Sequence, residues 1–352
     1  MRYLHPRPSS IVAALYTARD LGVDVAILHG PSGCSFKHAR LLEEDGMRVL
    51  TTSLAENEFI FGGESRLEEV LAEAEASFAP VRMAVIGTCV AMIIGEDLES
   101  AVRGVTTPTI AVEIHAGYPE NIDGVIATLE AAAGAGWIDE QELDRQRRLL
   151  TAANEVERLR GGASRAYIEP ERGDLKHLAA RRLLELARSG LAGIAVMNAK
   201  KETAYMFSDV LAALHEAAPG APVRYIANLE ERGLSKIRAD ARRVREGLEG
   251  RGVPVEAIGA LDEYGALGER LGAEVRASGA AYALVAGVPH AIPREYTDGV
   301  EVFSITNGPR QVAPLRDLGH AHVMVEVDLH PRTLGVRSIV ESEFGTVLRS
   351  MT

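Results

Sequence analysis

The stretch VDVAILHGPSGCSFK, residues 23–37, decides the fold class. It opens with a continuous apolar run that ends at about Leu28. It then turns through Gly30 and Gly33 to Cys34, after which helical spacing begins. A strand of a parallel sheet is buried on both faces, so it reads as an unbroken apolar run. The stretch therefore predicts a buried strand, a glycine-marked turn and the start of a helix.

The same order of apolar run, turn and amphipathic stretch recurs along the 352 residues. Further strands are predicted at residues 82–88, 109–114, 194–198, 223–227, 253–258, 282–286, 300–305 and 323–327. Helices are predicted at residues 35–45, 94–103, 121–133, 140–160, 202–217 and 234–248. This alternation is typical of an α/β protein with parallel sheets and crossover helices. We expect residues 1–165 to form one α/β domain and residues 190–352 a second α/β region, either one sheet or two small Rossmann-like subdomains.

Composition and charge exclude several classes of protein. With 47% hydrophobic and 25% charged residues the chain is of ordinary globular type. Its net charge of -12 argues against a surface that coats nucleic acid or an anionic membrane. No apolar run approaches the roughly 20 residues of a membrane span, and the N-terminus MRYLHP lacks a signal-peptide core. We expect a cytoplasmic protein without nucleic-acid or membrane partners.

The common nucleotide and hydrolase motifs are absent from the sequence. It contains no G-x-x-x-x-G-K-[ST], no G-x-G-x-x-G after a strand, no C-x-x-C, no H-E-x-x-H and no G-x-S-x-G. An α/β chain without these fingerprints is not expected to be a common dehydrogenase, kinase or P-loop ATPase.

A second cysteine follows a second predicted strand, in GTCVAMIIGED at residues 87–97. Cys34 and Cys89 are the chain's two cysteines, and each comes after the carboxyl end of a strand, the edge at which open α/β sheets bind ligands. A helix N-terminus favours a thiolate, which we expect for Cys34, and Gly33 would let backbone approach a bulky ligand. The two thiols predict a site for a soft metal.

Two thiols do not complete a four-thiolate site. A 4Fe-4S cluster usually has four protein ligands, and a twofold homodimer of this chain would supply them. Four thiolates could hold zinc in the same way, so the number of cysteines does not distinguish iron from zinc. The alternative is that both cysteines are small buried structural residues, and their positions alone favour the two interpretations about equally.

Around these cysteines the chain resembles the catalytic components of nitrogenase-like reductases. The turn HGPSGC at residues 29–34 and the stretch at residues 87–97 match the cysteine motifs of that family. Within it, the sequence is most similar to the short homodimeric subunits of Ni-sirohydrochlorin a,c-diamide reductive cyclases. Three more segments carry this similarity: HPRPS at residues 5–9, RLLEEDG at residues 40–46 and ENEFIFG at residues 56–62.

The resemblance implies a nitrogenase component 1-like fold with two to three Rossmann-like domains. It implies an oxidoreductase of coenzyme F430 biosynthesis, in methanogenesis, that reduces a nickel tetrapyrrole and closes a lactam ring. A separate ATP-hydrolysing iron–sulfur reductase would donate electrons through a 4Fe-4S cluster shared across the homodimer, and nickel would enter only with the substrate. Nitrogenase proper has a further cysteine before the first strand. Residues 5–10, HPRPSS, have none, so one such cluster per dimer is expected.

Candidate substrate contacts are basic residues and histidines at predicted strand ends, because the expected substrate carries several carboxylates. They are Lys37, Lys200, Arg310, His5 and His290. A surface charge or a structural histidine is the ordinary alternative for each of them.

Reduction also needs protons, and His115 closes the third strand, where Glu113 could orient its imidazole. Two other functional classes stay open: a nitrogenase-like scaffold or tetrapyrrole carrier without redox catalysis, and a cluster-free binding module. Another nitrogenase-like tetrapyrrole reductase is also compatible with these motifs.

Overall fold

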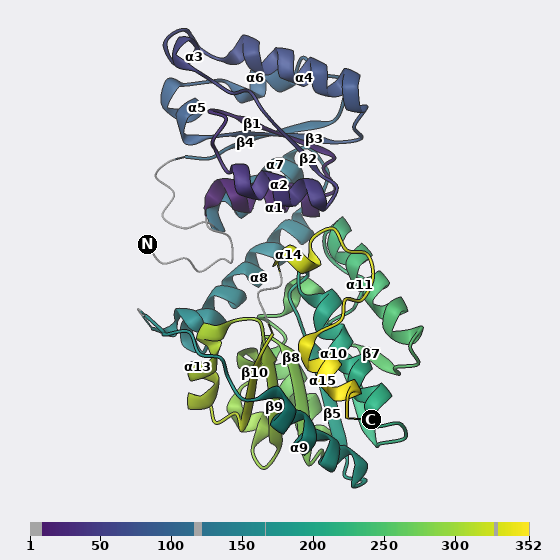
Figure 1. Cartoon of the computed structure of the whole chain (residues 1–352). Coiled ribbons are helices and arrows are strands. Elements are labelled where there is room, and N and C mark those ends of the chain that lie inside the picture. The colour runs from purple at the N-terminus through teal and green to yellow at the C-terminus, as the bar shows by residue number, and fades with distance from the viewer. Residues whose placement is uncertain (1–8, 116–121, 166, 327–329, 352) are drawn as a thin grey trace. The chain divides into compact units, whose positions relative to one another are not determined.

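The structure is a computed structural model that describes residues 9–115, 122–165, 167–326 and 330–351 (Figure 1). The chain divides into two compact units. Unit 1 comprises Met1–Arg148 and Leu234–Lys236, and unit 2 comprises Leu149–Gly233 and Ile237–Thr352. Each unit is an α/β structure with its own parallel sheet, as the sequence predicts.

Unit 1 is built on a four-stranded parallel sheet with strand order β2-β1-β3-β4. Its strands are β1 (Val25–His29), β2 (Arg48–Thr51), β3 (Met83–Gly87) and β4 (Thr109–Glu113). Every residue of β1 and β3 is buried, which explains their unbroken apolar sequences. The parallel register aligns His29 with Gly87 and Gly87 with Glu113, so the carboxyl ends of β1, β3 and β4 lie side by side.

Helices cover both faces of this sheet. Unit 1 contains α1 (Ser10–Asp20), α2 (Phe36–Glu44), α3 (Glu56–Phe61), α4 (Glu64–Phe78), α5 (Cys89–Ile94), α6 (Leu98–Val102) and α7 (Ile122–Gly134). Figure 1 shows α4 and α6 on one face and α1, α2 and α7 on the other. The single helix predicted at residues 94–103 is wrong. Gly95, at φ 79°, ends α5 in the left-handed conformation that glycine tolerates, and α6 starts three residues later.

Unit 2 contains one six-stranded parallel sheet with strand order β10-β9-β8-β5-β6-β7. Its strands are β5 (Gly193–Asn198), β6 (Val223–Ala227), β7 (Val255–Ala257), β8 (Tyr282–Gly287), β9 (Glu301–Thr306) and β10 (His322–Val325). The chain proceeds outward from β5 in one direction and then returns to β8 on its other side. The gap between β5 and β8 is therefore the topological switch point, where ligands bind in open sheets of this kind.

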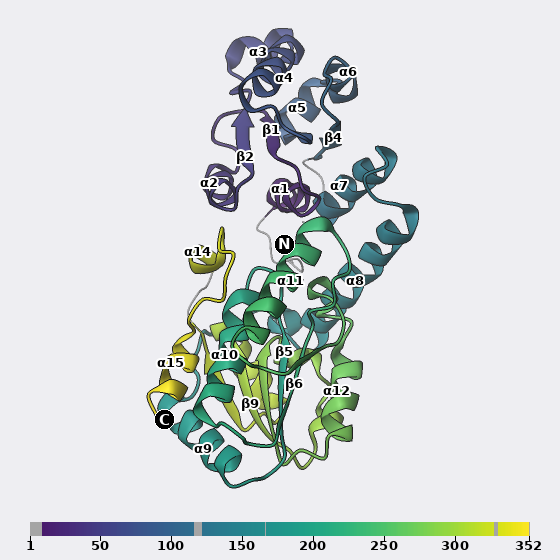
Figure 2. The same ribbon diagram turned by 90° about the vertical axis from the view of Figure 1, so that its right-hand side faces the viewer.

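The helices of unit 2 form a layer on each side of the sheet. They are α9 (Lys176–Arg188), α10 (Ala204–Ala217), α11 (Ser235–Glu249), α12 (Gly268–Ala277), α13 (Val312–Asp317), α14 (His330–Thr333) and α15 (Glu343–Arg349), preceded by α8 (Glu140–Leu159), which begins in unit 1. Figure 2 shows α12 on one side of the strands and α9, α10 and α15 on the other. Within the described ranges, no helix is both long and apolar enough to span a bilayer.

Candidate functional site

The first cysteine lies in a tight turn between β1 and α2. β1 ends at His29, and the N–H of Cys34 donates to the carbonyl of Pro31 at 3.1 Å. Ser35 has φ 56°, and α2 begins at the next residue, so Cys34 lies just ahead of a helix, as the sequence predicts. A Cβ added at Gly33 would meet no described atom within 4 Å, so packing within this chain does not require glycine there.

The second cysteine opens α5 directly after β3. Thr88, the residue before the helix, is extended, and Cys89 is its first residue. Like Cys34, Cys89 is partly buried. Gly87 at the end of β3 leaves room for α5 and α6, because a Cβ there would lie 2.6 Å from the Leu98 side chain and 2.9 Å from that of Met92.

The two cysteine turns contact each other. The N–H of Thr88 donates to the carbonyl of His29 at 3.0 Å, and a Cβ on Gly30 would lie only 2.1 Å from Oγ1 of Thr88. Burial and then the charge of Cys89 raise the pKa of the Cys34 thiol. Burial and a like charge disfavour ionisation, so in the chain without metal they oppose the thiolate expected at Cys34 from its place ahead of a helix. A bound cation would reverse that balance.

A buried histidine and a carboxylate brace both turns. The His29 ring contacts Oγ1 of Thr52 at 3.1 Å and Oε2 of Glu96 at 3.3 Å. The other oxygen of Glu96 accepts the N–H of Gly63 at 2.7 Å, at the junction of α3 and α4. Burial lowers the pKa of His29 even though Glu96 opposes the change, so the ring is neutral near pH 7. Sequence reasoning missed this role of Glu96.

Large apolar side chains are exposed on the helices next to the cysteines. Phe36 on α2 is 65% exposed, Ile93 on α5 is 76% exposed and Phe61 on α3 is 84% exposed. Ile60 and Phe59 of α3 are also exposed. Exposed apolar surface of this kind commonly marks a protein interface.

The predicted proton donor lies at the same edge of the sheet. Glu113 is the last residue of β4 and pairs in register with Gly87, two residues before Cys89. Nε2 of His115 lies 3.6 Å from Oε2 of Glu113, and both side chains are about half exposed, at 55% and 50%. The structure therefore places Glu113 where it can orient the His115 ring. Lys37 is an exposed residue of α2. His5 lies outside the described residues.

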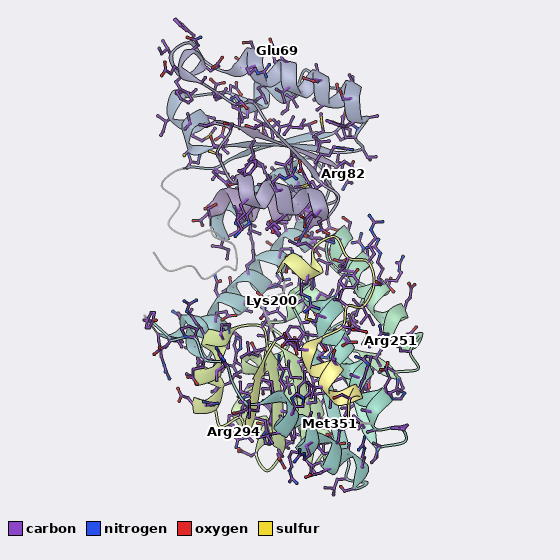
Figure 3. The ribbon with its side chains drawn as sticks, in the orientation of Figure 1. Glu69, Arg82, Lys200, Arg251, Arg294 and Met351 are labelled. Atoms are coloured by element: carbon purple, nitrogen blue, oxygen red, sulfur yellow. The ribbon has the colours of Figure 1, made fainter. Side chains whose placement is uncertain are left out.

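The other candidates follow strands of the sheet in unit 2, and Figure 3 labels one of them, Lys200. Lys200 follows β5, His290 follows β8, and both contact Glu157 of α8. Oε1 of Glu157 lies 3.3 Å from Nζ of Lys200 and 3.5 Å from Nε2 of His290. Its Oε2 accepts Nε2 of Gln311 at 3.2 Å, next to the exposed Arg310.

Charge pairing dominates this group. Burial opposes ionisation of Glu157, but Lys200 and His290 outweigh it and hold the pKa of the carboxyl far below its usual range. Burial likewise opposes the charge of Lys200, but Tyr264 and Glu157 outweigh it and raise the pKa of the ammonium. Nζ of Lys200 also lies 4.9 Å from the centre of the Tyr264 ring. Sequence reasoning missed Glu157 because it lies in a charged helical stretch that looks like solvated surface.

The described residues contain no cluster of three or more histidine, cysteine or acidic side chains placed to hold a metal ion. One chain thus offers two neighbouring thiols and an exposed apolar rim. Thiolates suit iron–sulfur clusters, and two such pairs make the usual ligand set, so these residues fit half of a 4Fe-4S site.

Comparison with known proteins agrees with the resemblance seen in the sequence. Residues 10–142 match the family model "Nitrogenase component 1 type Oxidoreductase". The chain is 52% identical to "Ni-sirohydrochlorin a,c-diamide reductive cyclase complex, component CfbD" of Methanosarcina acetivorans, over 99% of this chain and 97% of that protein. The component CfbD of Methanothermobacter thermautotrophicus is 49% identical, over 98% of each chain.

These matches confirm the predicted fold class and the prediction of a nitrogenase-like oxidoreductase. A third relative, the component CfbD of Methanocaldococcus jannaschii, is 41% identical over 98% of each chain. With such identity over nearly full length, this chain belongs to the CfbD family of Ni-sirohydrochlorin a,c-diamide reductive cyclase components.

Proposed function

We propose that this chain is the catalytic component of a reductive cyclase that reduces Ni-sirohydrochlorin a,c-diamide and closes a lactam ring on it. The names of three relatives that match nearly the whole chain support the substrate. The observation that carries the catalytic role is the contact between the two cysteine turns, which holds both thiols at one ligand-binding edge. Nickel enters as part of the substrate.

Two copies of the chain share one 4Fe-4S cluster, held by Cys34 and Cys89 of each copy. The incomplete set of thiols in one chain and the exposed apolar side chains of α2, α3 and α5 support this arrangement. A twofold axis at this edge would bring the two thiol pairs together and cover the apolar rim. When bound, the cluster would supply one-electron transfer, with electrons delivered by a separate ATP-hydrolysing iron–sulfur reductase.

Other residues of the chain bind the substrate and move protons. His115 presents an exposed ring beside Glu113, which suits proton transfer to a substrate at this edge. Lys37 and Arg310 are exposed cations, suited to the carboxylates of a tetrapyrrole. His5 and His290 complete the proposed contacts, and Lys200 acts through its ion pair with Glu157.

Iron content and electron paramagnetic resonance test the shared cluster. Protein purified and reconstituted without oxygen should contain about four irons per two chains and give the electron paramagnetic resonance signal of a reduced cluster. Cys34→Ser and Cys89→Ser should each abolish this signal. His177→Ala, which removes an exposed histidine of α9, serves as the control and should retain it. A colourless wild-type protein after careful reconstitution would refute the cluster.

Turnover tests the catalytic role. With the ATP-dependent reductase, ATP and the nickel diamide, the wild-type dimer should change the absorption spectrum of the substrate. His115→Gln should slow this change while leaving iron content intact. An unchanged substrate spectrum in the presence of a full complement of iron would instead identify a scaffold or carrier.

A further inference from the structure

Four buried polar atoms at the switch point of the sheet in unit 2 have no hydrogen-bond partner among the described residues. They are Oδ1 of Asn198, Oε1 of Gln311 and both ring nitrogens of His290, of which Nε2 has only the 3.5 Å ion-pair contact with Glu157. Asn198 is fully buried and His290 is 2% exposed. Buried polar atoms are nearly always paired, so a group of unpaired ones at a ligand-binding edge indicates a binding site.

The neighbours of both amides fix which way they point. Nε2 of Gln311 donates to the Glu157 carboxylate, which can only accept, so the unpaired atom of Gln311 is its carbonyl oxygen. Nδ2 of Asn198 donates to the carbonyl of Tyr264 at 2.9 Å and that of Val288 at 3.5 Å. Asn198 therefore also offers an unpaired carbonyl oxygen. Both oxygens require a ligand that donates N–H or O–H groups.

The residues that carry these atoms are connected to one another. Gln311 and His290 contact the same Glu157 carboxylate, at 3.2 and 3.5 Å. Asn198 is linked to the His290 segment, because the N–H of Val288 donates to its backbone carbonyl at 2.8 Å. We call Glu157, Lys200, Asn198, His290 and Gln311 the Glu157 cluster.

The positive charge of Lys200 in the Glu157 cluster is neutralised by Glu157. Lys200 pairs with Glu157 at 3.3 Å and lies over the Tyr264 ring, so its ammonium is not available as an unpaired cation. A carboxylate entering here would face the Glu157 carboxylate and two carbonyl oxygens, and each of these repels it. A neutral group with N–H donors meets no such opposition.

Backbone closes over the cluster and limits the size of what can enter. A Cβ at Gly161 would lie 2.3 Å from Oε2 of Glu157 and 2.9 Å from Nε2 of His290. A Cβ at Gly162 would lie 3.1 Å from Nε2 of Gln311. The cluster therefore suits a small functional group at the end of a side chain rather than a ring.

We propose that the Glu157 cluster binds a primary carboxamide side chain of the substrate and rejects the corresponding carboxylate. The two N–H groups of the carboxamide donate to the oxygens of Asn198 and Gln311, and its carbonyl accepts an N–H of the His290 ring. This inference rests on the proposed function, in which the substrate is a diamide. It assigns to unit 2 the discrimination between the amidated tetrapyrrole and its unamidated precursor.

Equilibrium binding to the full chain tests the assignment without turnover. Ni-sirohydrochlorin a,c-diamide and unamidated Ni-sirohydrochlorin are titrated separately, and absorption changes give the two Kd values. Wild type should bind the diamide roughly tenfold more tightly or better, because the carboxylate compound leaves buried acceptors without a donor. Gln311→Met should lower that ratio several-fold. Gln141→Met, at an exposed position of α8, is the matched control and should leave it unchanged.

Glu157→Gln gives a change in the opposite direction that a merely structural role would not produce. This variant removes the negative charge and leaves Lys200 as an uncompensated cation, so the unamidated compound should gain affinity relative to the diamide. Equal Kd values for the two compounds in wild type, or a ratio unaffected by Gln311→Met and Glu157→Gln, would overturn the carboxamide site while leaving the proposed function standing. Wild-type protein that binds neither compound would refute the proposed function itself.

Discussion

The contact between the cysteine turns makes a quantitative prediction for Gly30→Ala. The new Cβ would lie 2.1 Å from Oγ1, 2.7 Å from Cγ2 and 2.9 Å from Cβ of Thr88, against an ordinary contact of 3.4–4 Å. Relief of the closest contact requires a movement of more than 1 Å, which a packed core resists. Overpacking of this kind costs about 1–3 kcal/mol, and we expect a loss of about 2 kcal/mol in the free energy of unfolding.

Thr88→Ala should relieve most of this loss when it is combined with Gly30→Ala. Oγ1 of Thr88 is buried without a hydrogen-bond partner among the described residues, so its removal alone breaks no hydrogen bond. We expect Thr88→Ala to cost less than about 1 kcal/mol by itself. The double variant should regain at least half of what Gly30→Ala loses, because the two nearest clashing atoms are gone.

Unit 1 offers a convenient assay for this double-mutant cycle. The single tryptophan of the chain, Trp137, lies in unit 1, so its fluorescence during urea unfolding of the metal-free protein reports on that unit. Gly33→Ala lies in the same turn, where a Cβ would meet nothing within 4 Å, and should cost less than about 0.5 kcal/mol. A double variant whose loss equals the sum of the single losses would refute the contact between the turns.

Three further outcomes concern the thiols, a buried histidine and the apolar edge. Because burial and then Cys89 raise the pKa of Cys34, its alkylation by iodoacetamide should begin at higher pH than for an ordinary cysteine. Cys89→Ser should move that profile to lower pH, and an unchanged profile would contradict the closeness of the thiols. Burial, then Arg294 and His290, lowers the pKa of His320 to about 4. As the pH falls, the unfolded chain therefore takes up this proton before the folded chain does. The free energy of unfolding of unit 2 should decrease by about 3 kcal/mol between about pH 7 and about pH 4. In unfolding curves followed by circular dichroism, His320→Gln should remove most of this decrease. Ile93→Asp should yield monomers in light scattering. The control Val81→Asp should stay dimeric, although Val81 is as exposed as Ile93, at 75% and 76%. A dimeric Ile93→Asp would exclude α5 from the interface.

The sequence predicts the strands well because burial on both faces leaves a local signal. β1, β3 and β6 lie within two residues of their predicted bounds. β2 is absent from the prediction because this edge strand, Arg48–Thr51, is only partly buried and has no unbroken apolar run. The helices α4 and α12 were also missed. Charged residues interrupt the apolar positions of both helices, which hides their buried faces in the sequence.

The residues of the candidate site also divide into those that the sequence predicts and those that it does not. The positions of the cysteines, His115, Lys200 and His290 follow from one rule, that functional residues gather after the carboxyl ends of parallel strands. Glu157 and Glu96 obey no such rule, because each reaches its partners from a helix or a loop far away in the sequence. Glu157 and His290, for example, are separated by more than 100 residues and meet only in the folded unit. Such pairings depend on tertiary packing, which has no local signature.

The bond network of Glu96 gives the exposed edge a mechanical property. The Glu96 carboxylate joins Gly63, two residues after α3, to the buried His29 ring that precedes the Cys34 turn, and Glu96 itself follows α5, which Cys89 begins. The apolar end of α3 and the two cysteine segments are thus connected through one set of hydrogen bonds. A protein that docks on α3 is therefore positioned relative to the sulfur atoms by the same contact.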